Sequence, residues 1–511
     1  MTDWAEGYVA DVAYTAGFYR ELSPRFLTYV GLLQRARVPD IGKPFRYCEL
    51  GCGQGVSTTV LAALYPHAQF TGIDFNPAHI ASARSLAAEG ELDNVAFREE
   101  SFLEALEQDD AELPQQDFIT LHGTYTYVSR ENRRAIVDFI RRKLRPGGLV
   151  FVSYKTMPGW LQMMPLQRLM HEHAARHPDA SHRQLDAAMH FIDSLAEADT
   201  RFFETNQAAT ERMKKLREKD KRYLTHEFMP ENWEPIYHTD LVREMGEAKL
   251  DYVGSAGLLD NFAALSLPEK TREIHDQTAD PAFREVIKDF ATNQQFRRDV
   301  LVKGRQALTG PQERRELENL TFLPLRTAAN MSTEFRTPLG RATGQASIYQ
   351  PIIDAVSQGA TKLGDLMAES DARTGQLVQA SAALTQSGQI HPVVGDRGGT
   401  AVASARRLNR AMAQRALDGE GYGYLAAPAI GNGVPARDHE IVAFDVLSRH
   451  EVRTAEELAQ GMLARFKRVG RRLVKDGRTL ETDEENLAEF RAHAETIMRD
   501  RVPVWRQLRI L

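Results

Sequence analysis

The sequence predicts an α/β fold with a mainly parallel sheet, and three observations support that prediction. Short apolar runs alternate with helical patterns from residue 44 to residue 154. The first apolar run, residues 45–50, leads into a glycine-rich turn at residues 51–55. The next apolar run, residues 68–74, ends in a carboxylate. Strands that alternate with helices in this way pair in parallel, because each helix carries the chain back across one face of the sheet.

The expected elements follow from the spacing of apolar residues and from turn signals. Residues 25–35 have the amphipathic pattern of a helix that precedes the sheet. Within the alternating region we expect strands at 45–50, 68–74, 95–98, 118–122 and 149–154, and helices at 58–64, 78–89 and 130–144. Arg145-Pro-Gly-Gly148 stops the last of these helices and leads into the fifth strand. Further along, a helix at 240–247 precedes strand-like runs at 250–256 and 299–303.

A long helical region interrupts this alternation between residue 160 and about residue 223. Its last part, residues 212–222, is strongly basic and has a helical pattern. The basic run is either a solvated helix face or an anchoring surface for an acidic protein substrate.

The pattern changes again beyond residue 304. Residues 352–356, 363–367 and 374–384 predict three helices, and residues 389–394 with a glycine-rich turn at 396–399 predict a β-wing. This arrangement is winged-helix-like. Its presumed third helix has no Lys or Arg beyond Arg373 at its edge, which gives DNA binding little support and favours a protein-contact or dimer role. Residues 401–511 predict further helices with a break at 419–435.

Composition and charge narrow the functional classes. A chain of 511 residues favours several domains, and 42% hydrophobic with 26% charged residues is ordinary for a globular protein. The formal net charge of -6 argues against a protein that depends on overall attraction to nucleic acid or to an anionic membrane. The sequence shows no signal-peptide pattern and no apolar run of membrane-spanning length, so we expect a cytoplasmic protein.

The glycine-rich turn is the candidate ligand site. Glycine lets the backbone approach a ligand where a Cβ would clash, and the free N–H groups of the following helix face that ligand. Glu49 directly precedes the glycines and suits a cationic ligand, whereas it would repel a diphosphate. Asp74 stands where an acidic side chain binds ribose hydroxyls in doubly wound folds; the alternative is that it caps the helix after Pro77. Cys48 and Cys52 are expected to be reduced packing residues.

An acidic residue followed by G-x-G-x-G resembles the signature of the class I S-adenosylmethionine-dependent methyltransferases. The chain is similar in particular to bacterial methyltransferases with a methyltransferase regulatory domain, which include the rickettsial protein-lysine methyltransferases of outer-membrane proteins. The motifs that carry this resemblance are Tyr14 with Phe18-Tyr-Arg-Glu-Leu-Ser-Pro24, Tyr47-Cys-Glu-Leu-Gly-Cys-Gly53, His122-Gly-Thr-Tyr-Thr-Tyr-Val-Ser129, Val152-Ser-Tyr154 with Pro158-Gly-Trp160, and His226-Glu-Phe228 with Asn232-Trp-Glu-Pro235. The part of the chain after residue 303 matches only in layout.

The resemblance implies a Rossmann-like sheet of seven strands, in which residues 250–256 and 299–303 are the sixth and seventh strands and form an antiparallel edge. The expected units are an N-terminal lid segment at 1–43, a cofactor-binding core at 44–155, a helical insertion with a regulatory or dimerisation role at 156–235, the remainder of the methyltransferase sheet at 236–305, a winged-helix-like domain at 306–400 and a C-terminal helical domain at 401–511. The aromatic residues of the first unit either close over the cofactor or pack a helix onto the sheet.

The same resemblance assigns the site residues. S-adenosylmethionine is the implied cofactor, and the residues expected to bind it are Tyr14, Glu49, Gly51, Cys52, Gly53, Gly55, Asp74, Phe75, Ser101, Phe102 and His122. The candidate catalytic residues are Tyr125, Tyr127 and His122, which follow the fourth strand and open on the crevice at the carboxyl ends of the strands. The alternative for the tyrosines is a packing role.

We therefore expect a methyltransferase that transfers methyl groups to lysine side chains of a protein by in-line displacement. One alternative is methylation of a small molecule, and another is a non-catalytic, cofactor-sensing scaffold. The loop after the fourth strand lacks the carboxylates of metal-dependent catechol-type enzymes and the Asn/Asp-Pro-Pro-aromatic turn of nucleic-acid methylation, which disfavours a metal and a nucleic-acid partner. The expected partners are a protein substrate and a second copy in a homodimer, with no membrane.

Overall fold

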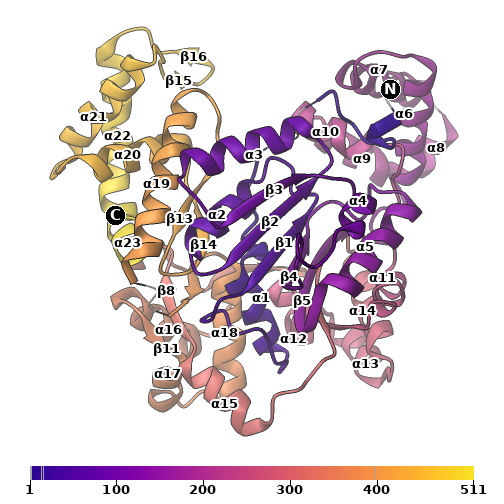
Figure 1. Cartoon of the computed structure of the whole chain (residues 1–511), viewed down its shortest axis with the longest axis horizontal. Helices are drawn as coiled ribbons and strands as arrows, with labels where there is room; N and C mark the ends of the chain where they lie inside the picture. Colours follow the sequence, from indigo (N-terminus) through magenta and orange to yellow (C-terminus); the bar gives the residue numbers. More distant parts are fainter. Residues whose placement is uncertain (1–2, 13, 15, 199, 396–397) are drawn as a thin grey trace.

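The centre of the molecule is a seven-stranded sheet with the strand order β3-β2-β1-β4-β5-β7-β6 (Figure 1). The computed structural model describes residues 3–12, 14, 16–198, 200–395 and 398–511. Strands β1 to β5 pair in parallel, whereas β7 is antiparallel to both β5 and β6. The predicted Rossmann-like sheet of seven strands is therefore confirmed, with the sixth and seventh strands at its edge.

The strands of this sheet lie close to the predicted positions. They are β1 Arg46–Leu50, β2 Gln69–Asp74, β3 Val95–Glu99, β4 Gln116–Leu121, β5 Leu144–Lys155, β6 Leu250–Ser255 and β7 Phe296–Lys303. Because β4 ends at Leu121, His122 lies in the loop that follows it. The Arg145-Pro-Gly-Gly148 segment falls inside β5, where the pairing with β4 shifts register between Gln116 and Phe118.

Helices cover both faces of the sheet, because neighbouring residues of a strand point to opposite sides. The helices of this part are η1 Asp3–Ala5, η2 Arg20–Leu22, α1 Pro24–Leu33, α2 Val56–Leu64, α3 Pro77–Glu89, α4 Phe102–Glu107 and α5 Arg130–Lys143. On one face Tyr47 and Phe151 share an apolar core with α1 and α2. On the other face Cys48 and Val152 share a core with α5 and with α11, which spans His238–Gly246. Cys48 and Cys52 are free and buried, as predicted.

The helical insertion follows β5 and packs around its own apolar cluster, which also contains Val9 of the N-terminal segment. It consists of α6 Met164–Arg176, α7 Ser181–Glu197, α8 Arg201–Thr205, α9 Gln207–Leu216 and α10 Lys221–Phe228, which Figure 1 shows beside the N-terminus. The basic run is not one continuous helix. Helix α10 starts at Lys221 because the Asp220 side chain accepts a hydrogen bond from the Arg222 backbone N–H at 2.8 Å and caps it.

The rest of the chain is mainly helical, as predicted. Around β6 and before β7 lie α11 His238–Gly246, η3 Leu258–Asn261, α12 Ala263–Ser266, α13 Glu269–Gln277 and α14 Pro281–Thr292. After β7 come α15 Gly310–Asn319, β8 Thr321–Pro324, η4 Ala328–Asn330, β9 Glu334–Thr337, β10 Gly340–Thr343, α16 Ala346–Gln358, β11 Thr361–Lys362, α17 Leu363–Glu369, α18 Thr374–Gln386 and β12 Ile390–Pro392. The last part contains α19 Gly398–Leu417, β13 Tyr424–Ala427, β14 Asn432–Pro435, α20 Asp438–Arg449, α21 Ala455–Arg468, β15 Val474–Lys475, β16 Arg478–Thr479, α22 Asp483–Thr496, η5 Ile497–Arg501 and α23 Val502–Gln507. None of the helices in the described part of the chain is both long enough and apolar enough to cross a bilayer.

Helices α16, α17 and α18 occupy the positions of the three helices predicted for the winged-helix-like region. Their small sheet has the order β11-β8-β12, so the partner of β12 is β8, which comes from upstream in the sequence. The predicted wing turn at 396–399 lies partly outside the described residues. The winged-helix classification stays a prediction.

The C-terminal region packs against the helices that follow β1 and β2. Figure 1 shows α19, β13 and β14 beside α2 and α3. Arg415 of α19 forms an ion pair of 2.6 Å with Glu89 of α3. Asn432 of β14 donates a hydrogen bond of 3.0 Å to the backbone oxygen of Arg20. The C-terminal region is thus in contact with both the sheet domain and the N-terminal segment.

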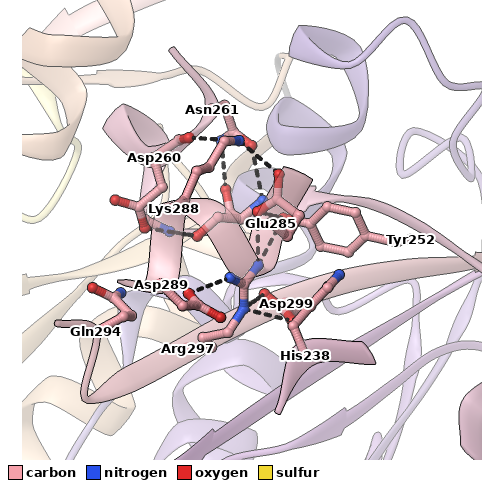
Figure 2. Close-up of polar contacts among 12 residues, drawn as sticks. His238, Tyr252, Asp260, Asn261, Glu285, Lys288, Asp289, Gln294, Arg297 and Asp299 are labelled. Carbon is pink, nitrogen blue, oxygen red and sulfur yellow. Dashed lines mark hydrogen bonds and ion pairs between the residues drawn. The ribbon is translucent and has the colours of Figure 1, made fainter. Parts of the chain in front are cut away.

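A buried cluster of charges fixes β7, the strand between β5 and the edge strand β6 (Figure 2). Arg297 donates to Asp289 at 2.7 Å, to Glu285 at 2.9 Å and to Asp299 at 3.1 Å. His238 of α11 lies 2.9 Å from the same Asp299. Burial alone would raise the pKa of Asp299, yet Arg297 and His238 hold it well below its usual range. One guanidinium therefore pairs with carboxylates from both α14 and β7 and holds the helix and the strand together.

Replacing Arg297 with methionine is expected to destabilise the protein by about 3–5 kcal/mol, because buried carboxylates lose their only guanidinium partner in this cluster. Urea unfolding followed by circular dichroism measures this loss. Arg314→Met is the matched control, because it removes an exposed pair with Glu318 and should leave stability unchanged. Equal stability of Arg297→Met and wild type would contradict the role of the cluster.

Candidate active site

The glycine-rich turn has the geometry that the sequence predicts. Gly51, Gly53 and Gly55 have φ values of +71°, +54° and +67°, a region that side chains with a Cβ rarely adopt. A Cβ on Gly55 would lie 2.5 Å from the Phe97 ring, so this glycine permits close packing beneath the turn. A Cβ on Gly53 would have no atom within 4 Å, which shows that the turn faces open space there.

Glu49 lies in β1 next to the end of the strand and is 4% exposed. The hydroxyl of Thr58 in α2 donates a hydrogen bond to its carboxylate. Burial raises the pKa of Glu49 to about 7, although the hydrogen bond from Thr58 acts in the opposite direction. The site thus contains a carboxylate that a nearby cation would keep ionised.

Asp74 ends β2 and is tied to the glycine-rich turn. Its carboxylate accepts hydrogen bonds from the backbone N–H of Gly53 at 2.8 Å and of Asn76 at 3.0 Å. The helix α3 is capped by Asn76, whose side chain accepts from the backbone of Ala78 and His79. The alternative that Asp74 caps this helix is therefore wrong, because the structure gives that role to Asn76.

A first cavity opens at the carboxyl ends of β1, β2 and β4, where the strand order reverses. Its lining contains every residue predicted to bind the cofactor except Gly55: Tyr14, Glu49, Gly51, Cys52, Gly53, Asp74, Phe75, Ser101, Phe102 and His122. Ser101 also caps a helix. Its hydroxyl accepts a hydrogen bond of 3.2 Å from the backbone N–H of Glu104 at the start of α4, a short helix that the sequence patterns did not predict.

The N-terminal segment lies over this cavity. The Trp4 and Tyr8 rings have centroids 5.7 and 6.0 Å from the centroid of Phe75. Gln54 of the glycine-rich turn donates a hydrogen bond of 2.7 Å to the backbone oxygen of Tyr14. Trp4 and Gln54 also line this cavity but are not among the predicted site residues, since the sequence patterns do not show which side chains of the N-terminal segment and of the turn face the ligand.

A second, larger cavity adjoins the first. Its volume is about 930 Å³, against about 150 Å³ for the first cavity. Its walls come from the helical insertion, from the loop after β4 and from β7. The residues that line both cavities are Tyr8, Tyr14, Tyr19, His122, Gly123 and Tyr127. Aromatic rings therefore form most of the junction between the two cavities.

His122 lies at this junction and is held from two sides. Ser153 accepts a hydrogen bond of 2.9 Å from the Gly123 backbone, and its hydroxyl lies 3.0 Å from Nδ1 of His122. The Tyr19 ring packs on the imidazole with the centroids 3.6 Å apart. Burial, with a smaller effect from Arg298, lowers the pKa of His122 to about 3. The imidazole is consequently neutral at physiological pH.

Tyr127, the second predicted catalytic residue at the junction, is held by a buried ion pair. Its hydroxyl donates a hydrogen bond of 2.8 Å to Glu227 of α10. The other oxygen of Glu227 pairs with Lys155 at the end of β5, and both charged side chains are at most 5% exposed. Lys155 Nζ also lies 4.0 Å from the centroid of the Trp160 ring. Neither Lys155 nor Glu227 was predicted as a site residue.

Tyr125 is placed elsewhere, which corrects its assignment as a catalytic candidate. It is fully buried in the core between the sheet, α5 and α11, and lines neither of the two cavities. Its hydroxyl donates to Glu244 of α11, and the Arg133 guanidinium lies over its ring at 5.3 Å. The packing alternative holds for Tyr125, because the loop after β4 turns this side chain away from the crevice.

Charged and aromatic side chains line the two cavities of the site. Among the residues that the structure describes, no group of three or more His, Cys, Asp or Glu side chains could hold a metal ion. The first cavity has two buried carboxylates at the glycine-rich turn, and the second has aromatic rings with basic side chains.

Comparisons with known proteins agree with this geometry. Residues 41–237 match the family model described as a methyltransferase domain, and residues 220–303 match a predicted methyltransferase regulatory domain. Protein sll1526 of Synechocystis is 37% identical over 99% of both chains. Trans-aconitate 2-methyltransferase of Methylobacterium nodulans is 33% identical over 32% of this chain and 57% of its own. PKMT2 from Rickettsia typhi in complex with AdoHcy shares the fold with a TM-score of 0.69 at 18% identity, over 95% of this chain and 98% of that chain.

The affinity of the first cavity for S-adenosylhomocysteine is expected to rise with pH through about 7, because Glu49 must be ionised to pair with the amino group of the ligand. Below that pKa the affinity should fall by roughly tenfold per pH unit, since protonation of the carboxyl competes with binding. Titration calorimetry on either side of neutral pH measures this slope. In Glu49→Gln the affinity should be lower and insensitive to pH; a wild-type affinity without pH dependence would contradict the role of Glu49.

Proposed function

We propose that this chain, which belongs to the family of class I S-adenosylmethionine-dependent methyltransferases with a methyltransferase regulatory domain, methylates lysine side chains of a protein substrate. The observation that carries the proposal is the junction of the two cavities. Tyr14, His122 and Tyr127 line both of them, so a ligand in the first cavity and a side chain in the second meet there.

The first cavity fits S-adenosylmethionine by the chemistry of its donors. Asp74 offers a carboxylate at the end of β2 for ribose hydroxyls, and Glu49 offers one for the cationic amino group. Phe75 and Phe102 supply apolar rings for the adenine. The open space at Gly53 lets the backbone approach the ligand closely.

The cofactor, when bound, supplies an electrophilic methyl group. The residues of the chain must hold the accepting nitrogen in line with that methyl group and exclude competing water. The rings of Tyr14, Tyr19 and Tyr127 offer flat apolar walls for the aliphatic part of a lysine. The neutral imidazole of His122 adds a polar group without a charge.

The accepting lysine must be neutral to act as a nucleophile. From a reference pKa near 10.4, deprotonation at pH 7 costs about 4.6 kcal/mol. Partial burial among the tyrosine rings lowers that pKa, because it disfavours the charged form. The cavity is open to solvent, so the proton can leave to water before the amine is enclosed.

The Lys155–Glu227 pair keeps this junction in place. Glu227 accepts from Tyr127 with one oxygen and from Lys155 with the other, so both oxygens are engaged. The buried carboxylate is thereby prevented from pairing with the incoming amine and from stabilising its protonated form. We assign Lys155 and Glu227 as positioning residues for Tyr127.

The fold likeness to PKMT2 from Rickettsia typhi extends over almost the whole of both chains. Together with the motifs that resemble the rickettsial protein-lysine methyltransferases, it supports a protein acceptor. A small-molecule acceptor is the second candidate, because trans-aconitate 2-methyltransferases are similar to part of the chain. That similarity covers only 32% of this chain, whereas the second cavity is built largely from the insertion and β7. The protein acceptor is therefore the favoured proposal.

The N-terminal segment is proposed to act as a lid, since Trp4, Tyr8 and Tyr14 line the first cavity from above the glycine-rich turn. Release of the cofactor product would require this segment to move. A homodimer also stays a prediction, which light scattering on the purified chain decides.

Tyr127→Phe is expected to lower kcat by roughly tenfold, because Glu227 loses the hydroxyl that fixes it and the junction loosens. Tyr125→Phe is the matched control, since it removes a hydroxyl that also donates to a glutamate but lies outside both cavities. Its kcat should equal that of the wild type, with a loss of about 1 kcal/mol in stability. Steady-state kinetics and urea unfolding measure both quantities; a comparable loss of kcat in Tyr125→Phe would show that Tyr125 takes part in catalysis.

Methyl transfer itself is tested with S-adenosylmethionine labelled in its methyl group and a bacterial lysate as the source of acceptors. We expect label in the protein fraction and methylated lysines after hydrolysis. Gly53→Arg is the control without cofactor binding, because its side chain would occupy the open space at the turn. Label only in the metabolite fraction would favour the small-molecule alternative. Cofactor binding without any transfer would favour a scaffold.

A further inference from the structure

We infer that the outer part of the second cavity is a cationic docking surface for acidic residues that flank the target lysine. This surface consists of Lys215 and Lys219 from the end of the insertion, together with Arg212 and Arg298. The inference rests on the proposed function, since it concerns how a protein segment reaches the junction. It names the chemical class of the substrate: an acidic, lysine-containing segment of a protein.

Lys215 and Lys219 differ from the other basic residues of the same run. Most of the neighbours have an acidic partner: Lys214 pairs with Glu211, Arg217 with Asp193, Lys221 with Asp186 and Arg222 with Asp220. Within the described residues, neither Lys215 nor Lys219 forms an ion pair, and these two lysines line the second cavity. The unpaired charges of the run therefore face the path of the substrate.

Arg212 and Arg298 add positive charge from two other directions. Arg212 lies over the Trp160 ring at 3.9 Å and donates to the backbone oxygen of Gly159 at 2.9 Å. Arg298 of β7 lies over the Phe296 ring at 5.1 Å. Neither guanidinium has a carboxylate within ion-pair distance among the residues described. Cations from α9, the loop after it and β7 thus converge on one cavity.

The acidic residues of the same cavity do not cancel this charge. Glu21 pairs with Arg20, Glu211 pairs with Lys214, and Glu227 pairs with Lys155. Two of these carboxylates are paired with cations outside the cavity lining, Arg20 and Lys214, and the third is paired with Lys155. The positive charges of Arg212, Lys215, Lys219 and Arg298 are therefore not compensated by the acidic residues of the cavity.

The positive charge of this cavity contrasts with the formal net charge of the whole chain, which is -6. The cationic surface is therefore a local feature and not a consequence of overall composition. A cavity lined by one sign of charge attracts segments of the opposite sign and speeds their association.

The same cations help the chemistry at the junction. An arriving lysine carries a positive charge that they repel, and this repulsion lowers the pKa of its amine. Acidic residues on either side of that lysine bind the cations and retain the segment.

The test uses three fluorescein-labelled peptides with one central lysine, flanked by Asp and Glu, by Asn and Gln, or by Arg. Fluorescence anisotropy with S-adenosylhomocysteine bound measures docking without turnover, and mass spectrometry with S-adenosylmethionine measures methylation. The acidic peptide is expected to bind roughly tenfold more tightly than the neutral one, with an advantage that declines as salt is added. In K215E/K219E this preference should disappear while the affinity for S-adenosylhomocysteine is kept.

The charge-matched control is K270E/K362E, which reverses two exposed lysines outside the second cavity and should keep the preference. Equal binding of the acidic and neutral peptides by the wild type, or an unchanged preference in K215E/K219E, would overturn the docking surface. Displacement of the acidic peptide by an RNA oligonucleotide that binds more tightly would overturn it as well, since the cations would then recognise phosphate. Selective docking without methylation of any peptide or lysate protein would instead refute the proposed function and leave the docking surface standing.

Discussion

The buried ion pair between Lys155 and Glu227 is the contact on which the geometry of the site depends. Lys155 ends the interior strand β5, and Glu227 belongs to α10, at the end of the helical insertion. Breaking a buried pair from one side is costly, because it leaves an uncompensated charge in the interior. The pair therefore fixes the insertion against the sheet. Tyr127 donates to the same carboxylate, so the ion pair also fixes the Tyr127 ring, which lines both cavities.

The two cavities differ in charge, and the difference suits two different ligands. The first has the buried carboxylates Glu49 and Asp74 at the glycine-rich turn, which favour a cationic cofactor. The second has Lys215, Lys219 and Arg298 without carboxylate partners among the described residues, which favour an acidic segment. Opposite charges on the two sides of one junction would orient the two proposed reactants before the chemistry begins.

Much of the fold follows from local sequence signals, and the limits of those signals are physical. The turn at Gly51 to Gly55 and the carboxylate of Asp74 are encoded by residues next to one another, and the structure places them as expected. Tyr125 and Tyr127 are two residues apart in a loop, where no periodicity tells which side chain enters the crevice. The capping of α10 by Asp220, the short helix α4 and the Lys155–Glu227 pair depend on turn chemistry or on contacts distant in sequence. The role of β8 as partner of β12 is a long-range pairing of the same kind.

A crystal structure of the chain with S-adenosylhomocysteine would show whether the two cavities meet at the reacting atoms. We expect the adenosine to lie between Asp74 and Phe102, with the sulfur beside Tyr14, His122 and Tyr127 and facing the second cavity. The methyl group of the cofactor would then point toward the acceptor. A sulfur directed away from the second cavity, or a ligand bound outside the first, would show that methyl transfer does not take place at this junction.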